Sequence, residues 1–389
     1  MHKSGYENLC ILMIFRFNAL ISWEFKEMKL TRGKKCSKMT VIRKEKMKIG
    51  GRKMRKTGKI IAAVMAGVMA LSMAGCSGNS GSDKETVKPG SEAAEGDKTG
   101  EAYKIGVLQL TQHTALDKVN EGFVAAIKDS GINVEIDQQN ASGDQSACQT
   151  IAQMLVDSES DLIFAIATPA AQAAAGVTEE IPIVVSAVTD PADSGLVESN
   201  ENPGRNVTGT SDLTPVKAQM DLLQKLLPDA KTVGILYSTA EANSEVQVEM
   251  AKEALEEAGI QYKEYTVSST NEIQTVVESM VGNVDAIYTP TDNTIASGYA
   301  TVAMVANENK IPTICGEGGQ VDEGGLVTYG VDYYQLGYMA GEQAAAILTE
   351  EADISSMPIE YMKDADCKLQ INEDTAKELG IDVSVLEDK

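Results

Sequence analysis

The sequence Asp285-Ala-Ile-Tyr-Thr-Pro-Thr-Asp-Asn293 is the most informative pattern in this chain. It opens with an acidic residue, continues through a short apolar run and stops at a proline ahead of polar residues. Such a run, bounded by turn residues, is typical of a fully buried parallel strand. A similar stretch occurs earlier as Asp161-Leu-Ile-Phe-Ala-Ile-Ala-Thr-Pro169. The two copies predict two similar lobes whose strand ends face a shared cleft.

Other landmarks repeat in the same order along the chain. Gly106 and Gly234 lie in matching apolar runs, and the spacing between them equals the spacing between Gly131 and Gly259. An Ile-Pro pair also follows each copy of the buried strand. Ordinary strand–helix units share a pattern, so chance likeness is the alternative interpretation. Four landmarks in one order favour structural duplication.

Strand and helix patterns alternate with short loops, which predicts parallel sheets with right-handed crossovers. The expected fold is α/β, with two doubly wound parallel-sheet lobes joined by a hinge. We expect the first lobe over residues 102–213 and the second over residues 214–314. The chain should then return to the first lobe over residues 315–349. Residues 350–389 should form a C-terminal segment that packs across both lobes.

The start of the chain has the character of a secretory signal. A basic segment ends at Lys59, and the apolar run from Ile60 to Met73 is too short to favour a membrane-spanning helix. The end of the run, Met73-Ala-Gly-Cys76, resembles the site at which bacterial lipoproteins are cleaved and lipidated. An apolar stretch that ends at a cysteine by chance is the alternative. We expect Cys76 to carry lipid and to anchor the protein on the membrane.

The flanking segments extend this prediction. Residues 1–46 do not fit a signal peptide, which should start close to its own methionine, and Met47 or Met54 would serve. We therefore expect residues 1–75 to comprise a mis-called start followed by the signal peptide. Residues 76–101 are rich in Gly, Ser, Lys and Glu and predict a flexible tether.

Composition excludes several classes of function. The chain holds 57 acidic and 34 basic residues, and half of the basic ones precede residue 76. The acidic remainder argues against a nucleic-acid partner, whose phosphates need Lys and Arg. Cys148, Cys315 and Cys367 have no metal-like spacing, and His113 is the one histidine after the signal. With no Gly-x-Ser-x-Gly elbow, phosphate loop or histidine triad, we expect no enzyme, catalytic residue, cofactor or metal.

Polar residues gather where the predicted strands end, and ligands bind at such ends in sheets of this kind. Two segments, Thr168-Pro-Ala170 and Ala242-Asn-Ser244, start helices, whose free N–H groups suit a carboxylate. Asp292 and Asp332 can accept bonds from an ammonium group. Together these features predict a clamp for a free amino acid.

An aromatic ligand would need a ring contact, and Tyr237, Tyr288 or Tyr334 can supply one. Each candidate also has a structural explanation: polar residues before helices are usually caps, and Asp190 before a proline can shape a turn. The expected ligand-binding residues are Gln112, His113, Asn140, Thr168, Pro169, Ala170, Thr189, Asp190, Tyr237, Ala242, Asn243, Ser244, Asp292, Asn293, Glu317 and Asp332.

Several blocks of the sequence together resemble the substrate-binding lipoproteins of tryptophan/tyrosine-type ABC importers. The resemblance covers roughly residues 103–346. The blocks are Ala167-Thr-Pro-Ala-Ala-Gln172, Ala187-Val-Thr-Asp-Pro191, Asn206-Val-Thr-Gly-Thr-Ser-Asp212, Pro215-Val-Lys217, Leu236-Tyr-Ser-Thr-Ala-Glu-Ala-Asn-Ser244, Pro290-Thr-Asp-Asn293 and Tyr329-Gly-Val-Asp-Tyr-Tyr334.

The resemblance implies the type I periplasmic-binding fold and capture of an aromatic amino acid by hinge closure. It also implies ABC permease subunits as partners and a location on the extracytoplasmic face of the membrane, and we expect a monomer. Few aromatic residues follow residue 76, so tyrosines or aliphatic side chains would have to hold a ring. A sugar or another small metabolite as the ligand, or a ligand-sensing effector module, are the alternatives.

Overall fold

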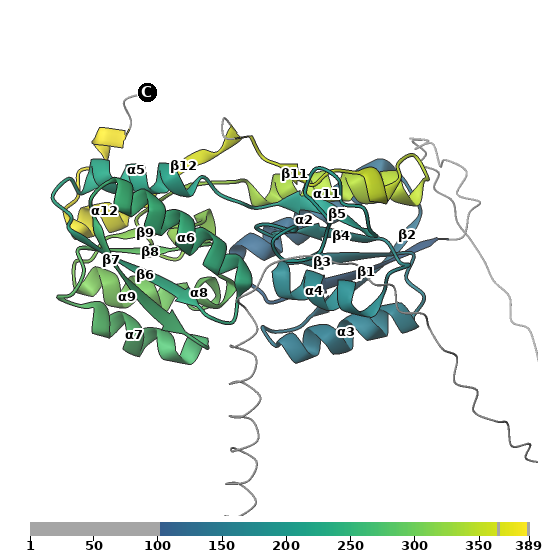
Figure 1. Ribbon diagram of the computed structural model, residues 1–389, viewed down its shortest axis with the longest axis horizontal. Coiled ribbons are helices and arrows are strands. Elements are labelled where there is room, and N and C mark those ends of the chain that lie inside the picture. Colours follow the sequence, from purple (N-terminus) through teal and green to yellow (C-terminus); the bar gives the residue numbers. More distant parts are fainter. Residues whose placement is uncertain (1–101, 364–365, 387–389) are drawn as a thin grey trace, which may run out of the picture. The chain divides into compact units, whose positions relative to one another are not determined.

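The computed structural model describes residues 102–363 and 366–386. These residues form two six-stranded, mainly parallel sheets flanked by helices (Figure 1). The predicted α/β fold with two doubly wound lobes is confirmed. The predictions for residues 1–101, which include the signal peptide, Cys76 and the tether, lie outside the described residues.

The first lobe is built on a sheet with the strand order β11-β5-β4-β3-β1-β2, in which every pairing is parallel. Its elements are β1 (Tyr103–Gln109), α2 (Thr114–Ser130), β2 (Val134–Asn140), α3 (Gln145–Asp157), β3 (Leu162–Ile166), α4 (Thr168–Val177), β4 (Ile183–Ser186), β5 (Val207–Ser211), α11 (Tyr333–Leu348), η2 (Ile354–Ser356) and β11 (Glu360–Tyr361).

The second lobe has the strand order β12-β10-β9-β8-β6-β7, and only the pairing of β12 with β10 is antiparallel among its described strands. Its elements are α5 (Val216–Leu226), β6 (Thr232–Ser238), α6 (Ala242–Glu257), β7 (Gln261–Val267), η1 (Thr270–Glu272), α7 (Ile273–Met280), β8 (Ala286–Thr289), α8 (Asn293–Ser297), α9 (Tyr299–Glu308), β9 (Thr313–Cys315), α10 (Gly318–Asp322), β10 (Val327–Gly330), β12 (Lys368–Ile371), α12 (Glu373–Leu379) and η4 (Ser384–Leu386).

The two aspartates that open the repeated stretches have the same structural role. A carboxylate oxygen of Asp161 accepts a bond from the backbone N–H of Lys104 at 2.7 Å. In the second lobe Asp285 accepts from the backbone N–H groups of Lys231 at 2.8 Å and Thr232 at 2.9 Å. Each aspartate therefore ties the start of a central strand, β3 or β8, to the start of the first strand of its lobe. The order β5-β4-β3-β1-β2 recurs as β10-β9-β8-β6-β7, so the lobes share one topology.

Within the described residues the chain passes between the lobes three times: from β5 to α5, from β10 to α11 and from β11 to β12. Residues 315–330, which we expected in the first lobe, lie in the second. The reason is that β10 is largely buried and pairs in parallel with β9. The return to the first lobe thus occurs just before α11. The C-terminal segment then adds β11 to the first sheet and β12 to the second.

Helices α2 and α11 pack against each other at backbone distance. A Cβ atom added to Gly122 would lie 2.0 Å from the carbonyl oxygen of Tyr334, and one added to Gly337 would lie 1.9 Å from that of Val119. Neither position has room for any side chain, so glycine is required by the close approach. The contact fixes α11 on the first lobe and with it Tyr333, at the start of that helix.

We expect Gly337→Ala to lower the free energy of unfolding by about 2 kcal/mol or more, because the new methyl group forces the two helices apart. Urea unfolding followed by circular dichroism measures the change. The control is Gly176→Ala on α4, where nothing lies within 4 Å of the added Cβ. This substitution should be neutral or stabilising by up to about 1 kcal/mol, since alanine favours helix. Equal stability of the two variants would contradict the packing argument.

Candidate ligand-binding site

A small cavity lies between the lobes, where the carboxyl ends of their strands meet. The loops that follow β1, β4, β5, β8 and β9 all reach it, together with the first turns of α2, α6, α8 and α11. Its lining residues are His113, Leu116, Ala187, Asp212, Asn243, Thr291, Asp292, Asn293, Ala296, Glu317 and Tyr333.

Three buried polar atoms in this lining have no hydrogen-bond partner: His113 Nδ1, Asn243 Oδ1 and Glu317 Oε1. All three side chains belong to the same cavity, and such orphaned atoms are uncommon in folded proteins. The residues come from both lobes, since His113 precedes α2 and the other two precede or begin helices of the second lobe. The cavity therefore offers unused hydrogen-bonding capacity to a guest.

The neighbouring bonds make the atoms of His113 and Asn243 acceptors, and Oε1 of Glu317 is an acceptor when its carboxyl group is ionised. Asn243 donates through Nδ2 to the carbonyl oxygen of Thr291 at 3.1 Å, which leaves Oδ1 toward the cavity. Glu317 accepts from the backbone N–H of Gly319 through Oε2 at 2.6 Å, which leaves Oε1 free. The ring Nε2 of His113 lies 3.1 Å from Oδ1 of Asn293, an acceptor, so Nε2 carries the proton. Burial lowers the pKa of His113, and Nδ1 of the neutral ring accepts.

The lining contains three carboxyl groups, those of Asp212, Asp292 and Glu317, and no lysine or arginine. The charge of Lys118, outside the lining, acts on Glu317. Burial raises the pKa of Asp212 to about 6 and that of Glu317 to about 7. Burial also raises the pKa of Asp292 to about 7, and the nearby carboxylate of Glu241 adds to the shift. A buried carboxylate is costly without a partner, so the cavity favours a cationic guest.

Asp212 is placed by the end of β5 and by two hydroxyl donors. It accepts from Oγ1 of Thr189 at 3.2 Å and from the hydroxyl of Tyr333 at 2.9 Å. The second bond links the segment after β5 to the start of α11, two of the places where the chain changes lobes. The cavity and the segments that join the lobes therefore share these side chains.

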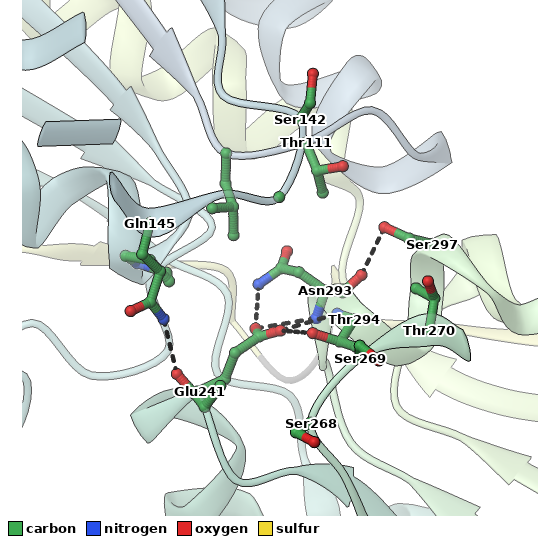
Figure 2. Close-up of a pocket in the computed structure, with 14 residues that line it drawn as sticks. Thr111, Ser142, Gln145, Glu241, Ser268, Ser269, Thr270, Asn293, Thr294 and Ser297 are labelled. Carbon is green, nitrogen blue, oxygen red and sulfur yellow. Dashed lines mark hydrogen bonds between the residues drawn. The ribbon is translucent and has the colours of Figure 1, made fainter. Parts of the chain in front are cut away.

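A larger groove adjoins the cavity and shares Asn293 with it (Figure 2). Residues of the first lobe, such as Thr111, Ser142 and Gln145, lie along one side. Ser268, Ser269, Thr270 and Ser297 of the second lobe lie along the other, and Glu241 lies between them. The groove is lined mainly by hydroxyl and amide groups.

Five of the predicted residues meet in the cavity: His113, Asn243, Asp292, Asn293 and Glu317. Two others stand one hydrogen bond behind it. Ser244 donates from Oγ to Asp292 at 2.7 Å, and Thr189 donates to Asp212. Gln112 and Pro169 line adjoining pockets in the cleft.

Thr168 and Ala170 are buried at the start of α4 and do not line the cavity. The hydroxyl of Thr168 is a further buried atom without a partner, and Ala167 caps this helix without a side-chain bond. In the matching place of the second lobe, Asp292 caps α8 through the backbone N–H of Ile295 at 2.8 Å. The start of α4 is therefore the one of these two that is left without a side-chain cap.

Other predicted residues lie elsewhere. Asp332 caps α11 and pairs with Lys368 at 3.2 Å. Its side chain is 36% exposed and does not line the cavity. Asp190 shapes a turn through the backbone N–H groups of Ala192 and Asp193, which is its structural explanation. Asn140 is an exposed residue that bonds the N–H of Ser142, and Ala242 is also exposed.

The tyrosines proposed as ring contacts do not line the cavity. Tyr237 donates its hydroxyl to Glu264 on β7, and Tyr288 donates to Gln219 on α5, because both side chains point from the sheet into its helix layers. Tyr334 is exposed beside Tyr338. Tyr333 supplies the aromatic wall instead, since neighbouring residues on a helix point in different directions.

Sequence reasoning missed Leu116, Ala187, Asp212, Thr291, Ala296 and Tyr333 as members of the lining. Asp212 could have been found, because an acidic residue directly after a buried strand matches Asp292 in position. The apolar members carry no such signal. Ala187 has the left-handed φ of 55°, which alanine rarely adopts and which no local pattern indicates.

Two duplicated lobes that enclose a cavity with unused acceptors, with side chains shared between cavity and hinge, define a ligand-binding protein of the bilobal type. The chain belongs to the family of ABC transporter substrate-binding proteins, whose model matches residues 104–386.

Individual relatives are similar over most of their length. A "Tyrosine-binding protein" of Clostridioides difficile is 40% identical over 84% of this chain and 94% of its own. A Streptococcus pneumonia ABC domain in complex with L-Trp is 39% identical, with a TM-score of 0.71 over 74% of this chain and 98% of its own. A ligand-free, open substrate-binding protein with adhesive properties from Clostridium difficile is 43% identical. Its TM-score is 0.57 over 72% of this chain and 96% of its own.

The TM-score is higher against the ligand-bound relative than against the open one, although identity and coverage are similar. The lobes here also bond directly: Gln145 donates to the carbonyl oxygen of Ala240 at 2.9 Å, and Lys118 lies 3.6 Å from Asp322. Both observations indicate a closed arrangement. In residues 102–363 and 366–386, no helix combines the length and apolar character needed to span a membrane.

The stability of the ligand-free protein should fall as pH rises from about 5 to about 8. Burial raises the pKa of Glu317 from 4.5 to about 7, so the folded state holds a proton that the unfolded state has lost. The contribution of Glu317 to stability is fully present below the pKa of the unfolded state. It is lost as the pH rises through the pKa of the folded state. In Glu317→Gln, the loss in the free energy of unfolding over this pH range should be smaller by on the order of 2 kcal/mol. Urea unfolding at several pH values measures the difference.

The control for this experiment is Glu323→Gln, which removes an exposed carboxyl group from the same lobe. As a surface substitution, it should change the free energy of unfolding by no more than about 0.5 kcal/mol. A Glu317→Gln slope equal to that of the unsubstituted protein would show that this carboxyl group does not titrate as its burial requires.

Proposed function

We propose that this protein captures a free amino acid with an aromatic side chain and delivers it to an ABC importer. The observation that carries the proposal is the set of three buried, unpartnered acceptors around one cavity. An ammonium group has three N–H donors and a positive charge, so it satisfies His113, Asn243 and Glu317 together and neutralises the buried carboxylates. The relatives that bind tyrosine and L-Trp support the choice of ligand.

The carboxylate of the ligand would lie toward the uncapped start of α4. This helix has no side-chain cap at Ala167, and the hydroxyl of Thr168 has no partner. N–H groups and the helix dipole favour an anion there. The start of α6, at Ala242 and Asn243, is a second source of N–H groups on the opposite lobe.

The side chain of the ligand would pack on the apolar part of the lining. Leu116 and the ring of Tyr333 supply contact area, and Ala187 and Ala296 are small enough to leave room for a ring. Closure of the lobes would then remove the ligand from water by a hinge motion, and the closed form would dock on the permease.

The site of action follows from the sequence before residue 102. We propose that the signal peptide directs export, that Cys76 is lipidated and that residues 76–101 tether the two lobes to the extracytoplasmic face of the membrane. A monomer is sufficient for this role, because each chain contains both walls of its own cavity.

Isothermal titration should give saturable heat with L-tyrosine or L-tryptophan, and none with glucose. Glu317→Gln should weaken the binding by about tenfold or more, because a neutral amide replaces a charge-assisted acceptor for the ammonium group. Glu323→Gln is the matched control and should bind like the unsubstituted protein. Heat with a sugar and none with either amino acid would contradict the proposal.

Cys76→Ser should move the protein from the membrane fraction to the soluble fraction of its host and abolish labelling by radioactive palmitate. Both effects follow because a serine hydroxyl does not replace the cysteine thiol as the lipid acceptor. Cys148→Ser, at a buried thiol in α3, is the control and should stay labelled and membrane-bound. Palmitate labelling that persists in Cys76→Ser would exclude this anchor.

A further inference from the structure

Glu241 is a buried carboxyl group that stands just outside the cavity, in the loop between β6 and α6 (Figure 2). Its Oε1 accepts from the backbone N–H and the hydroxyl of Thr294, both at 2.8 Å. Its Oε2 accepts from the backbone N–H of Asn293 at 3.1 Å and from Nδ2 of Asn293 at 2.6 Å. Both oxygens of this side chain therefore act as acceptors.

These bonds fix the orientation of the Asn293 amide. An amide has one donor end and one acceptor end, and a carboxylate oxygen at 2.6 Å can face only the donor end. The acceptor end, Oδ1, must then point the other way, across the cleft to Nε2 of His113 at 3.1 Å. Glu241 and Asn293 belong to the second lobe, whereas His113 belongs to the first.

The orientation of Asn293 in turn fixes the proton on His113. Because Oδ1 only accepts, Nε2 must donate, and the neutral ring leaves Nδ1 as a bare acceptor on the cavity side. Asp117 and Glu241 are the charged groups whose fields act on this ring, and Asp117 accepts from Gln109 rather than from the imidazole. The available hydrogen bond is therefore the one from Asn293.

We propose that Glu241 is a positioning residue that, through Asn293, holds His113 in the tautomer whose Nδ1 accepts a hydrogen bond from the ligand. The carboxylate is not itself part of the lining but accepts from two lining side chains, from Nδ2 of Asn293 at 2.6 Å and from Nδ2 of Asn243 at 3.5 Å. Through Asn293 it decides whether the cavity presents an acceptor or a donor at His113. The chemical class of ligand selected is an amine. The identity of the ligand rests on the proposed function, but the tautomer does not.

A different role for Glu241 would be to cap α8 and nothing more. The positioning role and the capping role can be separated because Glu241 bonds both the side chain of Asn293 and Thr294 in the first turn of α8. Glu241→Gln replaces one acceptor oxygen with a donor NH₂ group, which favours a reversed Asn293 amide. Nδ2 of Asn293 would then face His113, Nε2 would become the acceptor and Nδ1 would carry the proton. Thr294→Val removes one bond to the same carboxylate and leaves the bond between Glu241 and Asn293 in place.

The test is nitrogen-15 NMR of the histidine rings in the full chain, purified without a histidine tag and without ligand. The chain has two histidines, so His113→Gln assigns the signal. We expect Nδ1 of His113 to be unprotonated in the native protein and in Thr294→Val, and protonated in Glu241→Gln. A protonated Nδ1 in the native protein, or an unchanged ring in Glu241→Gln, would overturn the proposal.

Titration with L-tyrosine supplies the second readout. Glu241→Gln should weaken binding by about tenfold, the loss of one hydrogen bond to a charged group, and Thr294→Val by less than about twofold. Equal loss in both variants would assign Glu241 a merely structural role. If L-tyrosine fails to bind the native protein while the tautomer still switches, the proposed ligand is wrong and the positioning role stands.

Discussion

A buried hydrogen-bond acceptor without a donor costs free energy, and the closed cavity concentrates three of them between two lobes. Two further buried carboxyl groups, those of Asp212 and Asp292, lie near them, and no lysine or arginine lines the cavity. Each lobe could avoid this cost by opening to water, which would solvate the same atoms. A donor-rich cation that enters the closed cavity removes this cost and so stabilises the closed form. This constraint couples occupation of the site to the position of the lobes.

The unpartnered acceptors lie close to the segments that join the two lobes. Tyr333 and Asp212 join the cavity to two of the lobe-to-lobe passages, and α11 is held on α2 by a backbone contact that only glycine permits. The first lobe therefore moves as one body with its share of the site. Bonds such as that from Gln145 to Ala240 form only when the two bodies meet. Rigid lobes with a few linking side chains are the usual structure of a hinge.

Sequence patterns predicted the fold well because burial and periodicity are local. The repeated run after Asp161 and Asp285 specified both central strands, and the order of the landmarks specified the duplication. The return point was placed too early, since an isolated buried strand such as β10 fits either sheet until its partner is known.

The site was harder to predict, because polar residues at strand ends look alike in sequence. Asp292 and Asp332 were equal candidates for an ammonium contact. In the structure Asp292 faces the cavity, but it already accepts from Ser238 at 2.6 Å, from Ser244 and from Ile295. Asp332 faces Lys368 instead. Only the three-dimensional count of donors identifies Glu317 as the carboxyl group with a free oxygen.

The segments that follow the duplicated strands β3 and β8 differ in sequence. As a result, the two ends of the cavity differ in electrostatic character. In the second lobe, Asp292 and Glu241 fill the start of α8 with carboxylates, so this end repels an anion and suits an amine. In the first lobe, the start of α4 after the matching Thr-Pro segment has no side-chain cap and suits an anion. A zwitterion laid between them would direct its carboxylate toward the first lobe and its ammonium group toward the second, with His113 of the first lobe as one further acceptor. Because neither lobe alone satisfies both ends, the ligand gains its full set of bonds only in the closed form. The difference in binding between open and closed states is what allows a small molecule to drive the hinge.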